Sequence, residues 1–379
     1  MREKNNTNLT LGKVVVGGFW LYLDTILVNL IGYVYWLIIG RISGPDVVGY
    51  ASATLSITWI VQTMVLFGIP VGVQRFLGRA FGFGDHGSLK RYFLTSLTFL
   101  LFVVVVAAII LWYFNNILSS LIKIDAIYII LAGFLILFMG ISLLFKSFLI
   151  STLRIDKIFI FDVVANMVRL IGGVYLVILG YRGVGAVLGY VFSGFVSLIL
   201  FSLYTFKLIH GIKSESPIVS FSILKEILGA SYVSWLPTLI TTVGIQLGVL
   251  VIFGSHGAME TGIYFLAFAI FNVLLALPNM FLGILFPVLS GLESGHAQPT
   301  QRAMNLVLAA ATPLSVAMAI YSEFLLGLVG SAYTVGWFVL TVLAISVPFM
   351  CIVNGVNSLV YALGNYRAVL VIGSAMSFM

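Results

Sequence analysis

Three ionisable residues lie inside long apolar stretches of the sequence, where charged side chains are rare and energetically costly. Asp24 lies in the first such stretch, and Asp162 and Arg169 share the fifth. Seven residues turn an α-helix by about 700°, so Asp162 and Arg169 lie within about 20° of each other on one helix face, with Asn166 near the same stripe. A stripe with both charge signs could bind a charged substrate, or it could form an internal ion pair.

Asp24 has no second ionisable residue in its own stretch, and its charge can be accommodated in three ways. It is neutralised by a partner such as Arg169, it is protonated, or a water-filled cavity solvates it. A carboxylate in this position could couple movement to H⁺ or Na⁺, whereas an internal Asp–Arg pair could serve packing alone. Asn29 adds a polar point to the same stretch, and most such amides are expected to form hydrogen bonds between helices.

A basic cluster follows the second apolar stretch and consists of Arg75, Arg79, Lys90 and Arg91. Arginine and lysine side chains bind phosphate oxygens, so this cluster could hold an anionic headgroup such as a pyrophosphate. Alternatively, the four charges serve only to orient the chain in a membrane.

The residue types needed for catalysis are not grouped in this sequence, and we expect no enzymatic activity. The four histidines, His86, His210, His256 and His296, lie singly in different connections, and none has a Cys, Glu or His at metal-ligand spacing. No paired carboxylates or nucleophile–base pairs occur at useful spacing. We therefore predict no catalytic residues, no metal site and no cofactor.

The elements that carry these residues are predicted to be membrane-spanning helices. Hydrophobic residues make up 61% of the 379 and charged residues only 8%, and apolar runs of about 20 residues, enough to cross a hydrocarbon core, recur along the chain. Ten spans are predicted, near 14–40, 47–70, 93–114, 124–150, 158–180, 184–206, 229–253, 261–287, 304–326 and 335–358. An eleventh begins near Tyr366 and runs to Met379 without a polar flank, which is typical of a truncated C-terminus.

The distribution of positive charge predicts the orientation of these spans. With the N-terminus in the cytoplasm, only Arg41, Lys123 and Arg182 fall outside and Arg169 lies within a span, whereas the other Lys and Arg of the 19 fall inside. We expect a multi-pass protein of the plasma (inner) membrane. The net charge of +7 then faces anionic lipids of the inner leaflet, and it requires no nucleic acid as partner.

Two similar sequence segments indicate duplicated halves. An acid, a glycine and a tyrosine occur in order in both 44–51 and 258–264, and the spacing from Gly49 to Gly262 differs by only two residues from that between Gly68 and Gly283. Six spans separate the paired segments, so the halves are predicted to be parallel repeats. The predicted domains are an N-terminal six-helix bundle at 1–206, a cytoplasmic linker at 207–227, and an incomplete C-terminal bundle at 228–379.

The residues of several loops resemble those of a known family. Residues 41–50, Arg-Ile-Ser-Gly-Pro-Asp-Val-Val-Gly-Tyr, are similar to the loop after the first helix of polysaccharide flippases in the multidrug/oligosaccharidyl-lipid/polysaccharide exporter superfamily. Supporting segments are Gly68-Ile69-Pro70 followed by Arg75-Phe76, Gly262-Ile263-Tyr264, Leu325-Leu326-Gly327 before Ala332-Tyr333, and 362–367. The resemblance extends from about residue 10 to the end.

This resemblance implies an all-α fold of two six-helix bundles around a central cavity that opens alternately to the two membrane faces. The implied substrate is a polyprenyl-phosphate-linked or pyrophosphate-linked glycan, moved from the inner to the outer leaflet, with membrane lipids and glycan-assembly enzymes as partners. The cavity would be lined by Asp24, Asn29, Asp162, Asn166 and Arg169, with Arg75 and Arg79 at its cytoplasmic mouth. Chain termination within the eleventh helix departs from the family pattern.

Three other functions compete with this hypothesis. The first is a cation-coupled exporter of drugs or metabolites from the same superfamily, in which Asp24 is the coupling carboxylate. The second is a membrane enzyme or polymerase acting on lipid-linked sugars, against which the short external connections argue. The third is a helical scaffold without transport activity.

Overall fold

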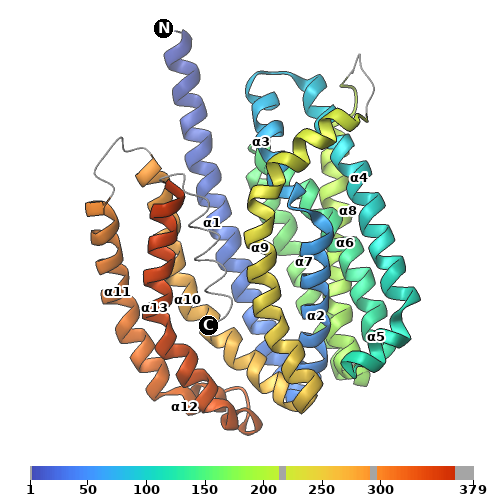
Figure 1. Ribbon diagram of the computed structural model, residues 1–379, viewed down its shortest axis with the longest axis vertical. Helices are drawn as coiled ribbons and strands as arrows, with labels where there is room; N and C mark the ends of the chain where they lie inside the picture. The colour runs from blue at the N-terminus through green and yellow to red at the C-terminus, as the bar shows by residue number, and fades with distance from the viewer. Residues whose placement is uncertain (1, 213–218, 291–296, 363–379) are drawn as a thin grey trace. The chain divides into compact units, whose positions relative to one another are not determined.

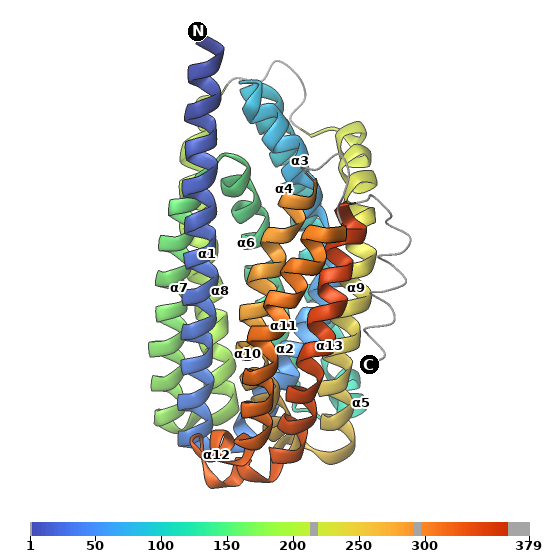
Figure 2. The same ribbon diagram turned by 90° about the vertical axis from the view of Figure 1, so that its left-hand side faces the viewer.

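The computed structural model describes residues 2–212, 219–290 and 297–362, and within these ranges the chain is almost entirely helical. Apolar runs form helices in a membrane because a helix satisfies its own backbone hydrogen bonds where no water is present. Figures 1 and 2 show long helices along most of the chain. The main helices are α1 (Arg2–Ser43), α2 (Pro45–Leu66), α3 (Ile69–Gly82), α4 (His86–Tyr113), α6 (Ala126–Ser151), α7 (Ile155–Leu176), α8 (Arg182–Ile209), α9 (Phe221–His256), α10 (Ala258–Ser290), α11 (Ala297–Ile320) and α13 (Trp337–Ala362).

Each of the ten predicted spans overlaps one long helix, but the number of spans is not settled by these overlaps. Eight helical stretches among the described residues are long and apolar enough to cross a membrane, or nine if the bent pair α2–α3 crosses as one. One of the eight, Ile155–Ile209, contains both α7 and α8, which pack against each other. Ten spans therefore remain a prediction, and the predicted eleventh span lies outside the described residues.

Two connections that we expected to be loops contain short helices. Residues 115–123 form α5 (Asn115–Ile122), and 327–334 overlap the end of α12 (Ser322–Gly327) and a 3₁₀ turn at Ser331–Gly336. The second predicted span also continues past its expected end, because α3 extends the chain as helix to Gly82 after a bend of 47°. The bend falls at Phe67 and Gly68, whose φ angles of 48° and 67° are left-handed and interrupt the helix.

Contacts between residues divide the chain into two compact units. The first contains residues up to Tyr35 and Thr54–Leu239, and the second contains Trp36–Ala53 with the chain after Ile240. These boundaries fall inside α1, α2 and α9, whereas the predicted domain boundaries fall at 206 and 228. The predicted repeat domains are thus not tested by the contact units, and they stay a prediction.

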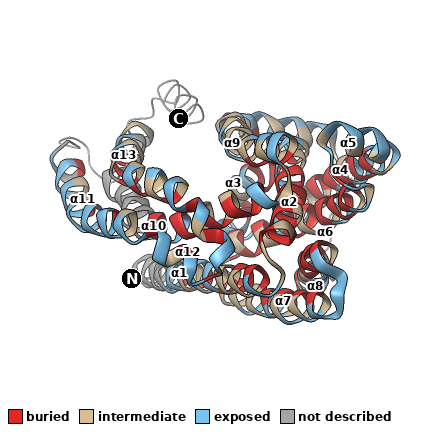
Figure 3. Cartoon of the chain, turned by 90° about the horizontal axis from the view of Figure 1, so that it is seen from below, coloured by how far each residue is buried: buried red, intermediate tan, exposed pale blue. Residues whose placement is uncertain are grey.

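The first unit is built around α6. This helix packs against α3, α4, α7 and α8, and 61% of its apolar window is buried. Buried residues are prominent on α2, α3, α4 and α6 in Figure 3. Helix α1 lies along α7, where Gly17 faces Ile155 and the rings of Trp20 and Phe159 are 5.1 Å apart. A side chain on α6 can therefore reach both α1 and α7.

The second unit contains a close helix crossing between the two repeated sequence segments. A Cβ atom on Gly49 of α2 would overlap the backbone carbonyl oxygen of Ala258, and a Cβ atom on Gly262 of α10 would overlap that of Pro45. Each glycine thus meets the carbonyl four residues before the other glycine, so the contact is reciprocal. Both α2 and α10 follow a glycine with left-handed φ, Gly44 at 81° and Gly257 at 91°.

Candidate functional site

The predicted carboxylates meet at a lysine in the interior of the first unit. The Lys146 Nζ atom on α6 lies 3.2 Å from Asp24 Oδ2 on α1 and forms a second, shorter ion pair with Asp162 Oδ2 on α7. Asp24 is buried, with 4% of its surface exposed, and only 14% of the Asp162 side chain is exposed. The three side chains join three helices of the unit through one ammonium group.

This group contains two acids and one base. Two carboxylates share the single ammonium of Lys146, and Asp24 Oδ1 is buried with no hydrogen-bond partner. Buried charges are stable only when paired and hydrogen-bonded, so Lys146 is required to hold both acids in this environment. We call Asp24, Lys146 and Asp162 the ion triad.

Arg169 lies on α7 two turns beyond Asp162 and is held between two aromatic rings. Its guanidinium carbon is 4.6 Å from the ring centre of Tyr190 and 5.6 Å from that of Tyr35, both within the range of cation–π attraction. Only 8% of Arg169 is exposed, and neither Nε nor Nη2 has a hydrogen-bond partner. A buried guanidinium with two unused donors can accept an anionic or carbonyl ligand.

Small residues make room for this aromatic pair. Tyr35 donates a hydrogen bond of 2.6 Å to the Ala186 carbonyl, and its hydroxyl lies 2.5 Å from where a Cβ of Gly173 would stand and 2.9 Å from that of Gly189. A side chain at either glycine would displace the Tyr35 ring. Gly32 of α1 is the neighbour of Arg169 Nη2, at 3.2 Å from the position of a Cβ.

The structure corrects the expected pairing of these charges. Arg169 was one expected partner of Asp24, and an internal Asp162–Arg169 pair was the packing alternative, but both carboxylates bind Lys146 instead. Among the described residues no carboxylate comes within ion-pair distance of Arg169. Asp162 and Arg169 both lie on α7, yet they belong to two separate groups.

The two asparagines make local contacts. Asn166 is buried and donates a hydrogen bond of 2.7 Å to the backbone carbonyl of Asp162, one turn earlier on α7. Asn29 is exposed on α1, and its amide donates to the Thr25 carbonyl at 2.7 Å. Both hydrogen bonds stay within one helix, and that of Asn166 is made to a residue of the ion triad.

Sequence reasoning missed Lys146, Tyr35 and Tyr190. Lys146 was counted among the cytoplasmic orientation charges, although it lies within the predicted span 124–150. That position was the available signal, because a lysine inside a span is a functional candidate by the same rule that selected Asp24. The tyrosines carried no comparable signal, since aromatic residues are abundant throughout the chain.

The predicted cytoplasmic mouth lies on helices rather than in a loop. Arg75 and Arg79 are exposed on α3, and the Arg79 guanidinium carbon is 5.9 Å from the ring centre of Phe83. Lys90 donates a hydrogen bond of 2.7 Å to the Ile212 carbonyl. Between α3 and α4, Asp85 accepts the Ser88 N–H at 2.9 Å, and hydrogen bonds from Ser88 lower the pKa of this carboxyl group.

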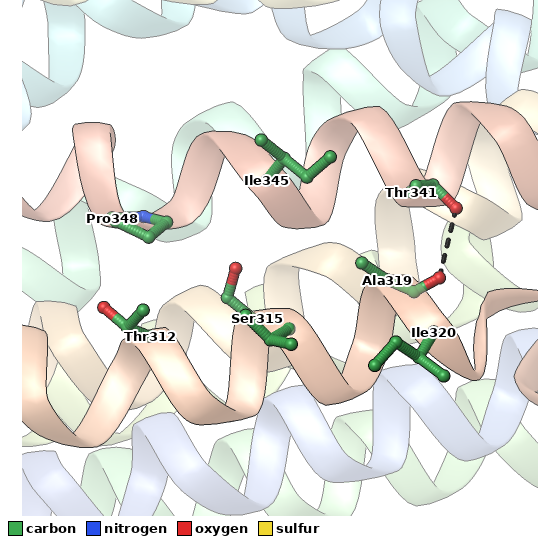
Figure 4. Close-up of a pocket in the computed structure, with 8 residues that line it drawn as sticks. Thr312, Ser315, Ala319, Ile320, Thr341, Ile345 and Pro348 are labelled. Atoms are coloured by element: carbon green, nitrogen blue, oxygen red, sulfur yellow. Dashed lines mark hydrogen bonds between the residues drawn. The ribbon is translucent and has the colours of Figure 1, made fainter.

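A cavity of about 450 Å³ lies in the second unit between α11 and α13 (Figure 4). Its lining has hydroxyl and apolar side chains but no charged residue: Thr312, Ser315, Val316, Ala319, Ile320, Thr341, Ile345 and Pro348. Two hydroxyls bridge the helices, because Ser315 donates to the Ala344 carbonyl at 2.6 Å and Thr341 to the Ala319 carbonyl at 3.3 Å. This cavity lacks the groups needed to bind an ionic substrate.

A metal site was not predicted from the sequence. No cluster of three or more His, Cys, Asp and Glu side chains that could hold a metal ion occurs in the ranges that the structure describes. The two acids of the ion triad are bridged by an ammonium group instead.

Long apolar helices with charged groups buried between them are typical of a polytopic membrane protein. Residues 21–191 match the MatE family. A search of curated protein sequences finds no match. The family match and the structural similarities below confirm the resemblance to the MATE-like exporter superfamily.

Several solved transporters have a similar fold. A multidrug resistance MATE family transporter of the MOP superfamily, in an inward-facing conformation, has a TM-score of 0.69 and 13% identity over 95% of this chain and 88% of its own. The lipid II flippase MurJ, in an inward closed conformation, has a TM-score of 0.70 and 13% identity over 94% and 78%. The Vibrio cholerae MATE transporter VcmN has a TM-score of 0.57 and 14% identity over 96% and 87%.

The chain thus has the fold of the MOP-superfamily transporters, and residues 21–191 match the MatE family model. The matched family and the similar structures are transporters, which is consistent with a protein that is not an enzyme. Both multidrug exporters and a lipid flippase have this fold, so the substrate has to be argued from the site.

Proposed function

We propose that this protein is a flippase for a lipid-linked oligosaccharide, which it moves from the inner to the outer leaflet by alternating access. The observation that carries the proposal is Arg169, a buried guanidinium with two unpartnered donors between the rings of Tyr35 and Tyr190. A lipid-linked glycan has a phosphate or pyrophosphate group at the junction of sugar and lipid, and guanidinium donors bind such oxygens in pairs.

The charges around Arg169 favour an anionic ligand. The Asp24 and Asp162 carboxylates are already bound by Lys146, so they do not neutralise the arginine. A phosphate group at Nε and Nη2 would supply the missing charge and hydrogen bonds together. A cationic drug would instead be repelled by the uncompensated guanidinium.

The proposed path of the substrate runs from the cytoplasmic face of the membrane to the outer leaflet. The protein lies in the plasma membrane with its N-terminus in the cytoplasm, and the two bundles at 1–206 and 228–379 alternate about the linker at 207–227. Arg75 and Arg79, both exposed on α3, are the proposed first contact of the anionic headgroup at the cytoplasmic mouth. Membrane lipids surround the bundles, and glycan-assembly enzymes deliver the substrate. The fold similarity to the lipid II flippase MurJ supports a lipid-linked substrate.

The test is complementation of a flippase-deficient bacterial strain by the full chain. Arg169→Ala should abolish glycan export at normal protein level, because it removes both free donors and the charge. Arg169→Lys keeps the charge without the paired donors, so we expect partial activity. The matched control is Arg154→Ala, which removes an exposed arginine between α6 and α7 and should leave export unchanged. Unchanged export by Arg169→Ala would rule out the proposed role of this residue.

A second candidate is a cation-coupled exporter of small amphipathic molecules. One observation favours it: Asp24 is buried within a span and has one oxygen without a partner, as a coupling carboxylate would. The flippase and exporter functions can be distinguished by an assay in liposomes that contain the purified protein, a fluorescent lipid-linked oligosaccharide and a cationic dye. Gradient-driven dye efflux that Asp24→Asn uncouples would support the exporter, and glycan-lipid movement without dye efflux would support the flippase.

A further inference from the structure

The ion triad has the composition of a cation site whose cation is part of the protein. Carboxylate oxygens of Asp24 and Asp162 approach one point from α1 and α7, and the Nζ atom of Lys146 occupies that point. Two carboxylates that face each other in a low-dielectric interior repel strongly unless a cation lies between them. Here the chain supplies this cation from α6, a largely buried apolar helix.

Among the described residues around Asp24 and Asp162, no cation other than Lys146 pairs with either acid. From α7, Asn166 donates its amide to the Asp162 backbone carbonyl, and Arg169 faces the Tyr35 and Tyr190 rings. On α1, Gly32 and Tyr35 lie next to the Arg169 guanidinium, and Gly32 is eight residues, or about 12 Å of helix, beyond Asp24. Lys146 is therefore the only positive group among the described residues that forms an ion pair with either acid.

We infer that Lys146 is the resident counter-ion of the Asp24–Asp162 pair and keeps this pair from binding Na⁺. In the wild-type protein a sodium ion would have to displace an ammonium group that is attached to the chain and already bonded to both acids. When the ammonium group is removed, the same carboxylates, including the unpartnered Oδ1 of Asp24, become ligands for Na⁺. The pair is thus a sodium site only in the absence of Lys146.

Occupancy of the site by Lys146 also bears on coupling, a point that rests on the proposed function. If the protein flips a lipid-linked glycan, the movement should not require a Na⁺ gradient acting at Asp24. The occupancy of the site by Lys146 can be tested without any substrate or gradient, so its outcome is independent of the complementation by Arg169 variants.

The experiment is thermal unfolding of the purified full chain in detergent, in NaCl or choline chloride at equal ionic strength. Wild type should show the same Tm in both salts. Lys146→Met removes the ammonium group and keeps a chain of similar length, so two buried acids lose their cation and the Tm should fall in choline chloride. Added NaCl should then raise the Tm of this variant in a saturable way, by about 3 °C or more, because a ligand that binds only the folded state stabilises it.

Two further variants assign the effect to the carboxylates. Lys146→Arg retains a cation and should be insensitive to Na⁺. Lys146→Met combined with Asp24→Asn lacks one acid and should lose the Na⁺ response. If the wild-type protein shows saturable stabilisation by Na⁺ that Asp24→Asn removes, the inference is wrong. A folded Lys146→Met protein without a Na⁺ response would overturn it as well. If Lys146→Met cannot be purified, the wild-type and Asp24→Asn measurements still decide between the two outcomes.

Discussion

At the scale of single residues, the interior of the first unit holds two cations in different states. Lys146 is bound by two carboxylates, whereas Arg169 has two donors without partners and is stabilised by aromatic faces. A guanidinium is less strongly hydrated than an ammonium and stacks on aromatic rings, so the arginine can remain charged in the position where a lysine would need a carboxylate. This difference leaves Arg169 available to a ligand and Lys146 committed to structure.

The aromatic support of Arg169 should be measurable as stability. Tyr190→Leu removes the ring 4.6 Å from the guanidinium carbon and its edge contact with Tyr35 at 5.6 Å between ring centres. We expect a loss of about 1–2 kcal/mol in the free energy of unfolding. Thermal or denaturant unfolding in detergent measures this loss. Tyr175→Leu on the same helix pair is the control, because Tyr175 is 60% exposed and should change stability little. Equal effects of the two variants would contradict a supporting role of Tyr190.

At the scale of secondary-structure elements, glycine decides how closely two helices approach. The crossing of α2 and α10 brings backbone against backbone at Gly49 and Gly262, and no side-chain rotation could make space for a Cβ there. Val48 and Thr261, which precede the two glycines, are both buried. The glycines of the repeated sequence segments thus have a packing function within the second unit.

Alanine at either crossing glycine should destabilise the protein. Alanine is about 1 kcal/mol better than glycine in a helix interior, but overpacking against a rigid backbone costs about 1–3 kcal/mol. We therefore expect Gly49→Ala and Gly262→Ala each to lower the Tm. Gly78→Ala in α3 is the control, since a Cβ there meets nothing within 4 Å and only the helix preference should act. A Tm of either crossing variant above that of Gly78→Ala would show that α2 and α10 can separate without cost.

At the scale of the whole molecule, orientation in the membrane is a prediction from charge alone. Lysine and arginine resist translocation, and those of this sequence are concentrated in alternate connections. The single cysteine, Cys351, is buried and so should react poorly with a polar reagent, which makes the wild-type chain a suitable background for labelling.

Cysteines introduced at two connections should report the orientation. Asp125→Cys, before α6, should react with a membrane-impermeant maleimide in intact cells. Arg154→Cys, before α7, should react only after the cells are permeabilised. Labelling in the opposite order would reverse the predicted topology and place the N-terminus outside.

Much of the helical architecture was accessible to sequence reasoning, and the failures have identifiable causes. Apolar runs located the long helices because burial of backbone polar groups in lipid permits few other structures. The same criterion does not detect α5 or the helix α3 that follows the second predicted span, because these segments are short or amphipathic rather than uniformly apolar. The motif glycines were recognised as repeated, but their contact across α2 and α10 was not predicted.

The sequence by itself determined that this is an all-helical membrane protein, that Asp24, Asp162 and Arg169 are embedded in it, and that the last two share one helix face. These conclusions depend on composition and on the period of a single helix, which are local properties of the chain. Only the tertiary structure decided that both acids bind Lys146 and that Arg169 lies between Tyr35 and Tyr190. The partner of a charge on another helix depends on the rotation and axial position of each helix, and these are set by the packing of glycines and aromatic rings between helices rather than by spacing along the chain.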